Sequence, residues 1–510
     1  MKLNRWQNAK RGMLFGLLFR ITGTLLPFLV QMVVIRKLGI EYIGIRGLFS
    51  SVLTVFSLAE LGFGSAIVFF MYKPIADDNI EELCALLNFY KKTYRIIGLV
   101  ILALGLIILP WLPHLVKGSY PSDINIYYVF ALFLAQSVLS YWMFAYKASL
   151  LNAYQRTDII NMIGTVVLVL TSLAQIALLY LTGSFYAYLI ASVVFTFVNN
   201  VLISAIVNKL YPRIKTKGKV NSNTLRDIQV KVSGLLVGKL CGISRNAFDI
   251  IFVSMFIGLS YAGIYSNYYY VIVAVTSFTS IITSSLLAGV GNSIVLESKE
   301  KIYRDMMVLN KIYLVIGGCM TACMLCLYQP FMTLWMGKDY LLPNEIIVLF
   351  SLYFYIQKMG DVRAVYSDAA GLFWENRWRN IGEAVANLIL NYVFVIKFGV
   401  FGIVLATVLT LFFIGFLGST QVIFRHYFNS GKKEYLLSEM KYLAIALLVC
   451  SITYLICSYI TFDSMLLLFV FRLIICFTIA PALYWIILSR GKDHRDVHTF
   501  LMRMIQGNQV

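Results

Sequence analysis

The chain alternates between long apolar runs and short polar segments. Each run is continuous and about 20 residues long, the length that an α-helix needs to cross a bilayer. A transmembrane β-barrel would instead show segments of about 10 residues with alternating polarity. The pattern predicts about fourteen transmembrane helices, at 13–35, 47–72, 96–112, 126–146, 159–181, 185–207, 232–257, 263–290, 312–331, 345–370, 380–396, 400–424, 442–460 and 465–489.

Composition supports the same class. Sixty per cent of the 510 residues are apolar and 13% are charged, and a soluble domain could not cover that much apolar side chain. The first run has no short apolar stretch followed by a small-residue cleavage site, so we expect a retained helix rather than a signal peptide. We predict an all-α polytopic membrane protein.

The net charge of +19 has an uneven distribution along the chain. With the N-terminus in the cytoplasm, the cytoplasmic segments hold 31 Lys and Arg residues and the outer segments hold six. Short loops rich in Lys and Arg stay on the cytoplasmic side. The excess therefore predicts cytoplasmic N- and C-termini and contact with anionic lipid, and gives no reason to expect a nucleic-acid partner.

A phrase near the N-terminus recurs in the middle of the chain. Residues 38–45 read LGIEYIGI and residues 257–264 read IGLSYAGI, an offset of 219 that also places Arg20 at the position of Lys239. Amphipathic segments follow at 77–92 and near 302–309, and we expect both to form amphipathic helices that lie on the cytoplasmic surface. The repeat predicts two pseudo-symmetric six-helix lobes. The expected organisation is a cytoplasmic N-terminus (1–12), an N-lobe (13–207), a cytoplasmic linker (208–231), a C-lobe (232–424), two extra helices (425–489) and a cytoplasmic tail (490–510).

Three stretches carry a resemblance to a known family: RKLGIEYIGIRGLFSSVLTVFSLAELGFGSAI, LLNAYQRTD and DIIFVSMFIGLSYAGIYS. They resemble the polysaccharide flippases of the multidrug/oligosaccharidyl-lipid/polysaccharide exporter (MOP) superfamily. The resemblance implies the MATE-like MOP fold. It also implies export of an undecaprenyl-diphosphate-linked glycan across the bacterial cytoplasmic membrane by alternating access. Capsule, O-antigen and other surface repeat units all fit, since the number of helices does not select a substrate.

The same resemblance sets expectations about partners. A flippase of this kind needs no cofactor, although H⁺ or Na⁺ can couple to transport. We expect a monomer in contact with membrane lipid, with association with a glycan polymerase as a further expectation. No nucleophile–base constellation or glycine-rich phosphate loop stands out, so we do not expect an enzyme.

Basic residues inside apolar runs are candidates for binding a diphosphate, because a charge facing lipid is costly. Arg20 and Lys239 hold equivalent positions in the two copies and are expected to line a central cavity. The alternative for Arg20 is snorkelling to the cytoplasmic interface. Arg46 either guides the phosphate outward or anchors the interface, and Arg363 is a further phosphate contact.

The acidic residues inside the runs leave alternatives open. Arg245 and Asp249 are four apart on one helix face, so they form either an internal ion pair or a phosphate site whose occupation frees Asp249 for an ion. Glu60 either carries a coupling proton or sodium ion or bonds to a neighbouring helix. Lys358, Asp361 and Asp368 share one stripe of a helix at spacings of three and seven, and local neutralisation is expected there.

Two rival functions and one rival site remain. A drug or metabolite antiporter of the same superfamily would carry cationic cargo and need an acidic cavity. A glycan polymerase or acyltransferase would need a substantial outer loop, which the run pattern does not provide. Cys319, Cys323 and Cys326 have spacing that suggests a metal site, but their run is apolar and has no nearby His or carboxylate, which favours helix packing.

Overall fold

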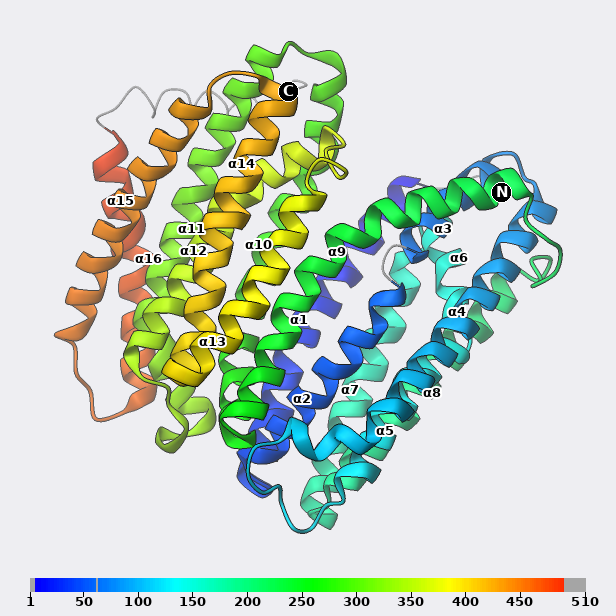
Figure 1. Cartoon of the computed structure of the whole chain (residues 1–510), viewed down its shortest axis with the longest axis horizontal. Helices are drawn as coiled ribbons and strands as arrows, with labels where there is room; N and C mark the ends of the chain where they lie inside the picture. The colour runs from blue at the N-terminus through cyan, green and yellow to red at the C-terminus, as the bar shows by residue number, and fades with distance from the viewer. Residues whose placement is uncertain (1–4, 61–62, 490–510) are drawn as a thin grey trace. The chain divides into compact units, whose positions relative to one another are not determined.

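The computed structural model describes residues 5–60 and 63–489 (Figure 1). These residues form α-helices joined by short connections, and no strand occurs among them. The chain divides into two compact units, Met1–Ser266 and Asn267–Val510. The predicted lobe boundary at 208–231 stays a prediction.

The first unit is a bundle of long helices. Its elements are α1 (Arg5–Lys37), α2 (Ile40–Phe56), the 3₁₀ turn η1 (Ser57–Glu60), α3 (Phe63–Ala76), α4 (Ile80–Ile108), η2 (Leu109–Leu115), α5 (Ile126–Trp142), η3 (Ala145–Lys147), α6 (Ala148–Ala153), α7 (Thr157–Thr182), α8 (Phe185–Leu210) and α9 (Ser222–Phe256). The helix α10 (Leu259–Leu296) begins in this unit and continues in the second.

The second unit is also helical. After α10 come α11 (Lys299–Met336), η4 (Lys338–Tyr340), α12 (Asn344–Ala369), α13 (Arg377–Thr410), the π-helical segment η5 (Leu411–Phe416), α14 (Leu417–Ile423), the π-helical segment η6 (Phe424–Phe428), α15 (Lys432–Ser458) and α16 (Met465–Ser489). Within this unit α15 and α16, coloured orange to red, pack side by side along α11.

Most described residues of the fourteen predicted apolar runs lie in helices, and the described residues contain nine helices that are long and apolar enough to cross a membrane, or ten with a bent pair. The lower number has several reasons. The run 47–72 is split between α2 and α3, α12 carries several charges, and the runs 380–396 and 400–424 merge into one span of 52 residues. Of α9, only the part Asn246–Phe256 is counted, and it is too short to be a span by itself. The chain is a multi-pass membrane protein; which side its termini face stays a prediction.

The 52-residue span folds back on itself at a glycine. Gly399 has φ +58° and ψ −135°, which breaks the helix of α13. In a straight helix, residues 20 positions apart would lie about 30 Å apart. Here the Asn387 amide donates to the hydroxyls of Thr407 and Thr410 at 3.3 Å. The segment is therefore a hairpin of two crossings, as the separate runs predicted.

Small residues bring α1 and α7 into close contact. A Cβ on Gly12 would lie 2.8 Å from Thr157 Oγ1, and one on Gly16 would lie 3.3 Å from Asn161 Nδ2. Phe19, on the same face of α1, packs on Gly164 of α7. Such small-residue stripes let membrane helices approach closely where the hydrophobic effect does not drive association.

The repeated phrases contact each other within the first unit. Gly39 (φ +123°) precedes α2 and Gly258 (φ +129°) precedes α10, so both helices begin after a residue in a region that favours glycine. A Cβ on Gly44 would lie 2.1 Å from the Leu259 carbonyl oxygen. Reciprocally, a Cβ on Gly263 would lie 2.4 Å from the Ile40 carbonyl oxygen. Gly44 and Gly263 are equivalent positions of the repeat, and so are Ile40 and Leu259. Each glycine of one copy therefore meets the equivalent carbonyl of the other copy, and the duplication builds a pseudo-two-fold helix crossing.

The two amphipathic segments are helical and hold equivalent positions, each at the N-terminal end of a longer helix. Asn79 caps α4 by accepting from the Glu82 amide, and Ser298, 219 positions later, caps α11 by accepting from the Lys301 amide. Each helix then continues from its amphipathic part into its apolar run. Leu83 and Ile302 are 1% exposed. These apolar positions pack against protein, and the location of the two segments at the cytoplasmic surface stays a prediction.

Candidate substrate-binding cavity

The first unit contains a cavity of about 230 Å³ with a mixed polar and apolar lining between α1, α2, α5, α7 and α8. It lies near the end of the unit where α2 begins, α7 ends and α8 begins, which is the outer side in the predicted topology. Its lining residues are Pro27, Val30, Arg46, Ser50, Phe133, Gln136, Leu168, Ser172, Gln175, Tyr188, Leu189 and Ser192.

Arg46 supplies the charge of this cavity. It lies on α2 one turn before Ser50, so both project from one face of the helix. Its Nη1 donates to the Tyr188 hydroxyl at 3.3 Å, which orients the guanidinium. A guanidinium has five N–H donors in a planar fork and can bind two phosphate oxygens at once. The sequence left two alternatives for Arg46, a phosphate guide and an interfacial anchor, and the geometry places it at a cavity.

Neutral hydrogen-bonding groups complete the wall. Gln175 on α7 donates to the Ser192 hydroxyl on α8 at 2.7 Å. Gln136 on α5 donates to the Thr196 hydroxyl on α8 at 3.2 Å. None of the described residues that line the cavity is acidic. The cavity therefore suits an anion or a polyhydroxy group better than a cation.

Arg20 and Lys239 are placed less completely. Arg20 lies on α1 two turns before the cavity residue Pro27, so it shares that face of the helix, and its side chain is half-buried. Lys239 lies on α9, but its side chain is outside the described residues, as is that of Arg245. The pairing of Arg20 with Lys239 at one diphosphate stays a prediction.

Glu60 bonds to two neighbouring helices. Tyr94 of α4 donates to Oε1 at 2.5 Å and Tyr141 of α5 donates to Oε2 at 2.5 Å. Tyr90 donates in turn to the Tyr94 hydroxyl at 2.6 Å. Both carboxylate oxygens thus fix η1 against the bundle, which is the structural alternative considered for this residue. A coupling role for Glu60 stays a prediction.

Asp249 is buried near the C-terminal end of α9 and is 1% exposed. The Tyr265 hydroxyl of α10 donates to its Oδ2 at 2.9 Å. This bond joins the two helices that flank Gly258. The predicted ion pair with Arg245 and the predicted ion-binding role of Asp249 stay untested.

In the second unit Arg363 is 4% exposed and lies beside the π-helical segments. Its Nη1 donates to the Thr420 hydroxyl at 2.8 Å and its guanidinium stacks on the Phe416 ring at 4.7 Å. Lys358, on the same helix, forms an ion pair with Asp361 at 2.5 Å, which is the local neutralisation expected for two of the three residues of that stripe. For Asp368 the expectation stays a prediction.

Sequence reasoning missed most of the lining. Ser172 and Gln175 are three apart on α7, and Tyr188 and Ser192 are four apart on α8, so each pair shares a helix face. That spacing is a signal that could have been found. Isolated neutral polar residues are common in membrane helices, however, and only the packing of α7 on α8 brings the two pairs together.

No protein-family model and no curated protein matches the chain. Solved structures do. The lipid II flippase MurJ, in an inward closed conformation, matches 94% of this chain and 99% of its own at 15% identity, with a TM-score of 0.66. An inward-facing multidrug resistance MATE family transporter of the MOP superfamily matches 82% of this chain and 94% of its own at 15% identity, with a TM-score of 0.59.

A MATE transporter from Vibrio cholerae matches 86% of this chain and 97% of its own at 14% identity, with a TM-score of 0.54. The chain has the MOP fold. At these identities the likeness establishes the fold alone, and the chemistry of the cavity must carry any statement about the substrate.

Proposed function

We propose that this protein is a flippase that exports an undecaprenyl-diphosphate-linked oligosaccharide, a repeat unit of a surface polysaccharide, across the bacterial cytoplasmic membrane by alternating access. The observation that carries the proposal is the cavity of the first unit, where Arg46 is surrounded by neutral hydrogen-bonding side chains. The lipid II flippase MurJ has the same fold, so the fold is compatible with a lipid-linked cargo.

A diphosphate needs compensation wherever it leaves water. Burying an unpaired anion is far costlier than burying a neutral polar group. Arg46 offers a fork held in place by Tyr188, and the Gln and Ser groups can bond to phosphate or sugar oxygens. In our proposal Arg20 and Lys239 hold the diphosphate deeper along the path, Arg245 and Arg363 are further contacts, and Glu60 or Asp249 binds a coupling H⁺ or Na⁺.

The membrane potential favours outward movement of such a head group. Each elementary charge that crosses 100 mV is worth about 2.3 kcal/mol. A diphosphate with a charge near −2 would therefore gain roughly 4–5 kcal/mol when it leaves a negative interior at that potential. The polyprenyl tail can stay in lipid while the head group crosses through the protein.

A cationic drug would need acidic side chains in the lining of the cavity. The MATE transporters share the fold, so an antiporter is the alternative within the same superfamily. A cation in a low-dielectric cavity needs a carboxylate partner, and the described lining has a guanidinium instead. This chemistry is why we prefer the flippase.

Transport in proteoliposomes tests the proposal. A fluorescent polyprenyl-diphosphate saccharide is reconstituted with the protein, and its arrival in the opposite leaflet is followed by quenching. Charge-assisted hydrogen bonds contribute about 1.5–3 kcal/mol, so Arg46→Ala should reduce the rate by roughly 10- to 150-fold. Arg46→Lys keeps the charge but loses the planar fork, so its transport rate should lie between those of the unmodified protein and Arg46→Ala.

The matched control is Lys397→Ala, which removes an exposed base outside the cavity and should leave the rate unchanged. Unaltered transport by Arg46→Ala would exclude a phosphate contact at this cavity. The double variant Arg20→Ala/Lys239→Ala should abolish export while the protein remains in the membrane. Normal export by that variant would show that the proposed cation pair does not exist.

A further inference from the structure

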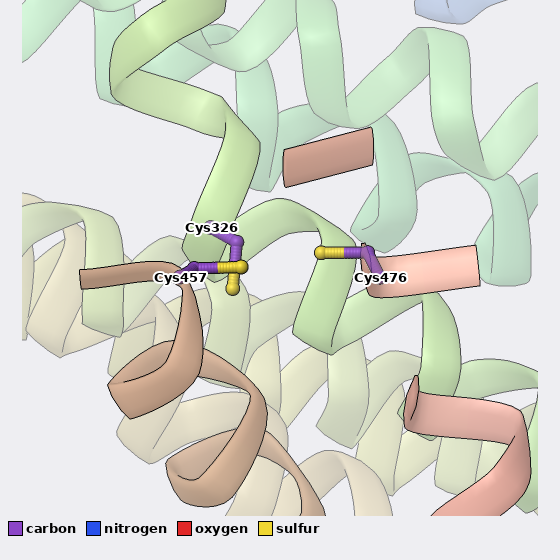
Figure 2. A group of neighbouring side chains, drawn as sticks. All are labelled: Cys326, Cys457 and Cys476. Carbon is purple, nitrogen blue, oxygen red and sulfur yellow. The ribbon is translucent and has the colours of Figure 1, made fainter. Parts of the chain in front are cut away.

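Three cysteines meet inside the second unit. Cys326 of α11, Cys457 of α15 and Cys476 of α16 have sulfur atoms that all lie within 4.8 Å of one another. Figure 2 shows the side chains of Cys326 and Cys457 meeting, with the sulfur of Cys476 pointing toward them. Each residue is 1% exposed. Three different helices therefore direct a thiol to one buried point.

A fourth cysteine lies next to the group. Cys323 is one turn before Cys326 on α11, in the order Cys-x-x-Cys, and it packs against the same core cluster. Half of the chain's eight cysteines thus gather in one place. The sequence interpretation, helix packing within the run of Cys319, Cys323 and Cys326, did not consider the thiols of α15 and α16.

The charge surroundings suit thiolates. Arg472 precedes Cys476 by four residues on α16, so it lies on the same helix face, and it interacts electrostatically with Cys457. A site of several thiolates and one metal ion carries a net negative charge, which is costly to bury without a partner. A half-buried guanidinium one turn away supplies that partner. Thiols that only fill space would need no such compensation.

The distances fit one metal ion. Zinc binds thiolate sulfur at about 2.3 Å in a tetrahedron, which places two sulfurs on one ion roughly 3.8 Å apart. The sulfurs here lie within 4.8 Å of one another, so small side-chain rotations close the remaining gap. Soft thiolate ligands select Zn²⁺ and Cu⁺ over hard cations. Each thiol that binds releases its proton to the solvent.

We propose that Cys326, Cys457 and Cys476 bind one thiophilic d¹⁰ metal ion, Zn²⁺ or Cu⁺, with Cys323 as the fourth ligand when the ion is tetrahedral. The ion clamps α15 and α16 to α11. Those two helices have no counterpart in the internal repeat, so no duplicated contact holds them. Cys457 is one residue from the C-terminal end of α15, which gives the ion a short path from the membrane surface.

Metal titration of the purified full-length protein tests this proposal. The protein is prepared with reduced thiols and titrated with Cd²⁺ as a spectroscopic probe for zinc and with Cu⁺ in a competition assay. We expect one Cd²⁺ per chain with a thiolate-to-metal charge-transfer band. Saturation should raise the melting temperature by about 5 °C, because a ligand that binds only the folded state stabilises it.

The variants assign the ligands. Cys326→Ser and Cys457→Ser should lose the charge-transfer band. The matched control is Cys450→Ser, because Cys450 is buried on the same α15 but bonds to the Gly318 carbonyl oxygen outside the group. Cys323→Ser distinguishes the two ions. If the ion has four ligands, this variant should lose affinity for Cd²⁺. If the ion has only the other three cysteines as ligands, the variant should keep its affinity for Cu⁺.

A measurement on the unmodified chain covers the case in which a variant fails to fold. Bound Cd²⁺ should protect Cys457 from alkylation at least 10-fold relative to the metal-free protein. The proposal is overturned if Cd²⁺ gives no charge-transfer band with reduced thiols. It is also overturned if alkylation is unchanged by the ion, or if mass spectrometry finds these cysteines linked as disulfides in the protein as purified.

Discussion

Substituting Gly44 by Ala should damage the helix crossing that the repeat builds. A Cβ at this position would lie 2.1 Å from the Leu259 carbonyl oxygen and 3.2 Å from the Gly263 amide nitrogen. Ordinary contacts of a Cβ begin at 3.4 Å, so the partner backbone must retreat by about 1.3 Å. A backbone carbonyl cannot rotate away as a side chain can.

The expected magnitude follows from overpacking. Forcing an extra carbon into a packed contact costs about 1–3 kcal/mol. For domains of this size each kcal/mol lowers the melting temperature by about 2–4 °C, so Gly44→Ala should melt roughly 2–12 °C below the unmodified chain. Gly263→Ala needs a retreat of about 1.0 Å from Ile40 O, at 2.4 Å, and should cost less.

The double variant gives the sharpest result. Both substitutions widen the same gap between α2 and α10, so the second methyl group enters space that the first has already opened. The double variant should therefore cost clearly less than the sum of the two single variants. Thermal melting of the detergent-solubilised protein, followed by size-exclusion chromatography, measures all three.

Gly382→Ala is the control, because that helical glycine has no atom within 4 Å of its added Cβ. It should be neutral or slightly stabilising. Two results would contradict the expected clash: Gly44→Ala melts within 1 °C of this control, or the destabilisations of the two single variants simply add. Either result would mean that the repeated glycines do not meet at one tight crossing.

Three further predictions concern buried polar groups. Glu60→Leu removes the acceptor of the Tyr94 and Tyr141 hydroxyls and should destabilise the protein by about 1–3 kcal/mol for each. Glu60→Gln keeps one acceptor oxygen and should lose less stability. Lys358→Met should cost at most about 3–5 kcal/mol, because Asp361 loses its cationic partner but keeps the Tyr313 hydroxyl as a donor, and Lys358→Met with Asp361→Asn should cost less than the single change. Asn387→Leu should cost about 1–3 kcal/mol by removing the bonds across the α13 hairpin. Thermal melting measures each change.

Specific outcomes would contradict these predictions. Equal melting of the Leu and Gln variants at position 60 would show that the tyrosines do not depend on the carboxylate. Full additivity at positions 358 and 361 would mean that the pair is not coupled. An unchanged melting temperature for Asn387→Leu would show that the hydrogen bonds of Asn387 across the hairpin do not stabilise it. For coupling, a pH profile of transport that is unchanged in Glu60→Gln would exclude Glu60 as the proton carrier.

The class of protein, the positions of most helices and the internal repeat follow from the amino-acid pattern alone. These features depend on local composition: a run of about 20 apolar residues must cross as a helix because lipid offers no partner for the backbone. The glycines that precede α2 and α10 and the caps Asn79 and Ser298 could be read at their offset of 219 for the same reason, since each acts within a few residues.

Tertiary structure decided the cavity and the cysteine group. Arg46 was a candidate from sequence, but its partner Tyr188 lies 142 residues away. Cys457 and Cys476 reach Cys326 only because α15 and α16 pack along α11. A membrane helix is apolar on nearly every face, so its hydropathy pattern does not state which side faces protein. That orientation is fixed by packing between helices distant in the chain, and it selects which polar side chains share a site.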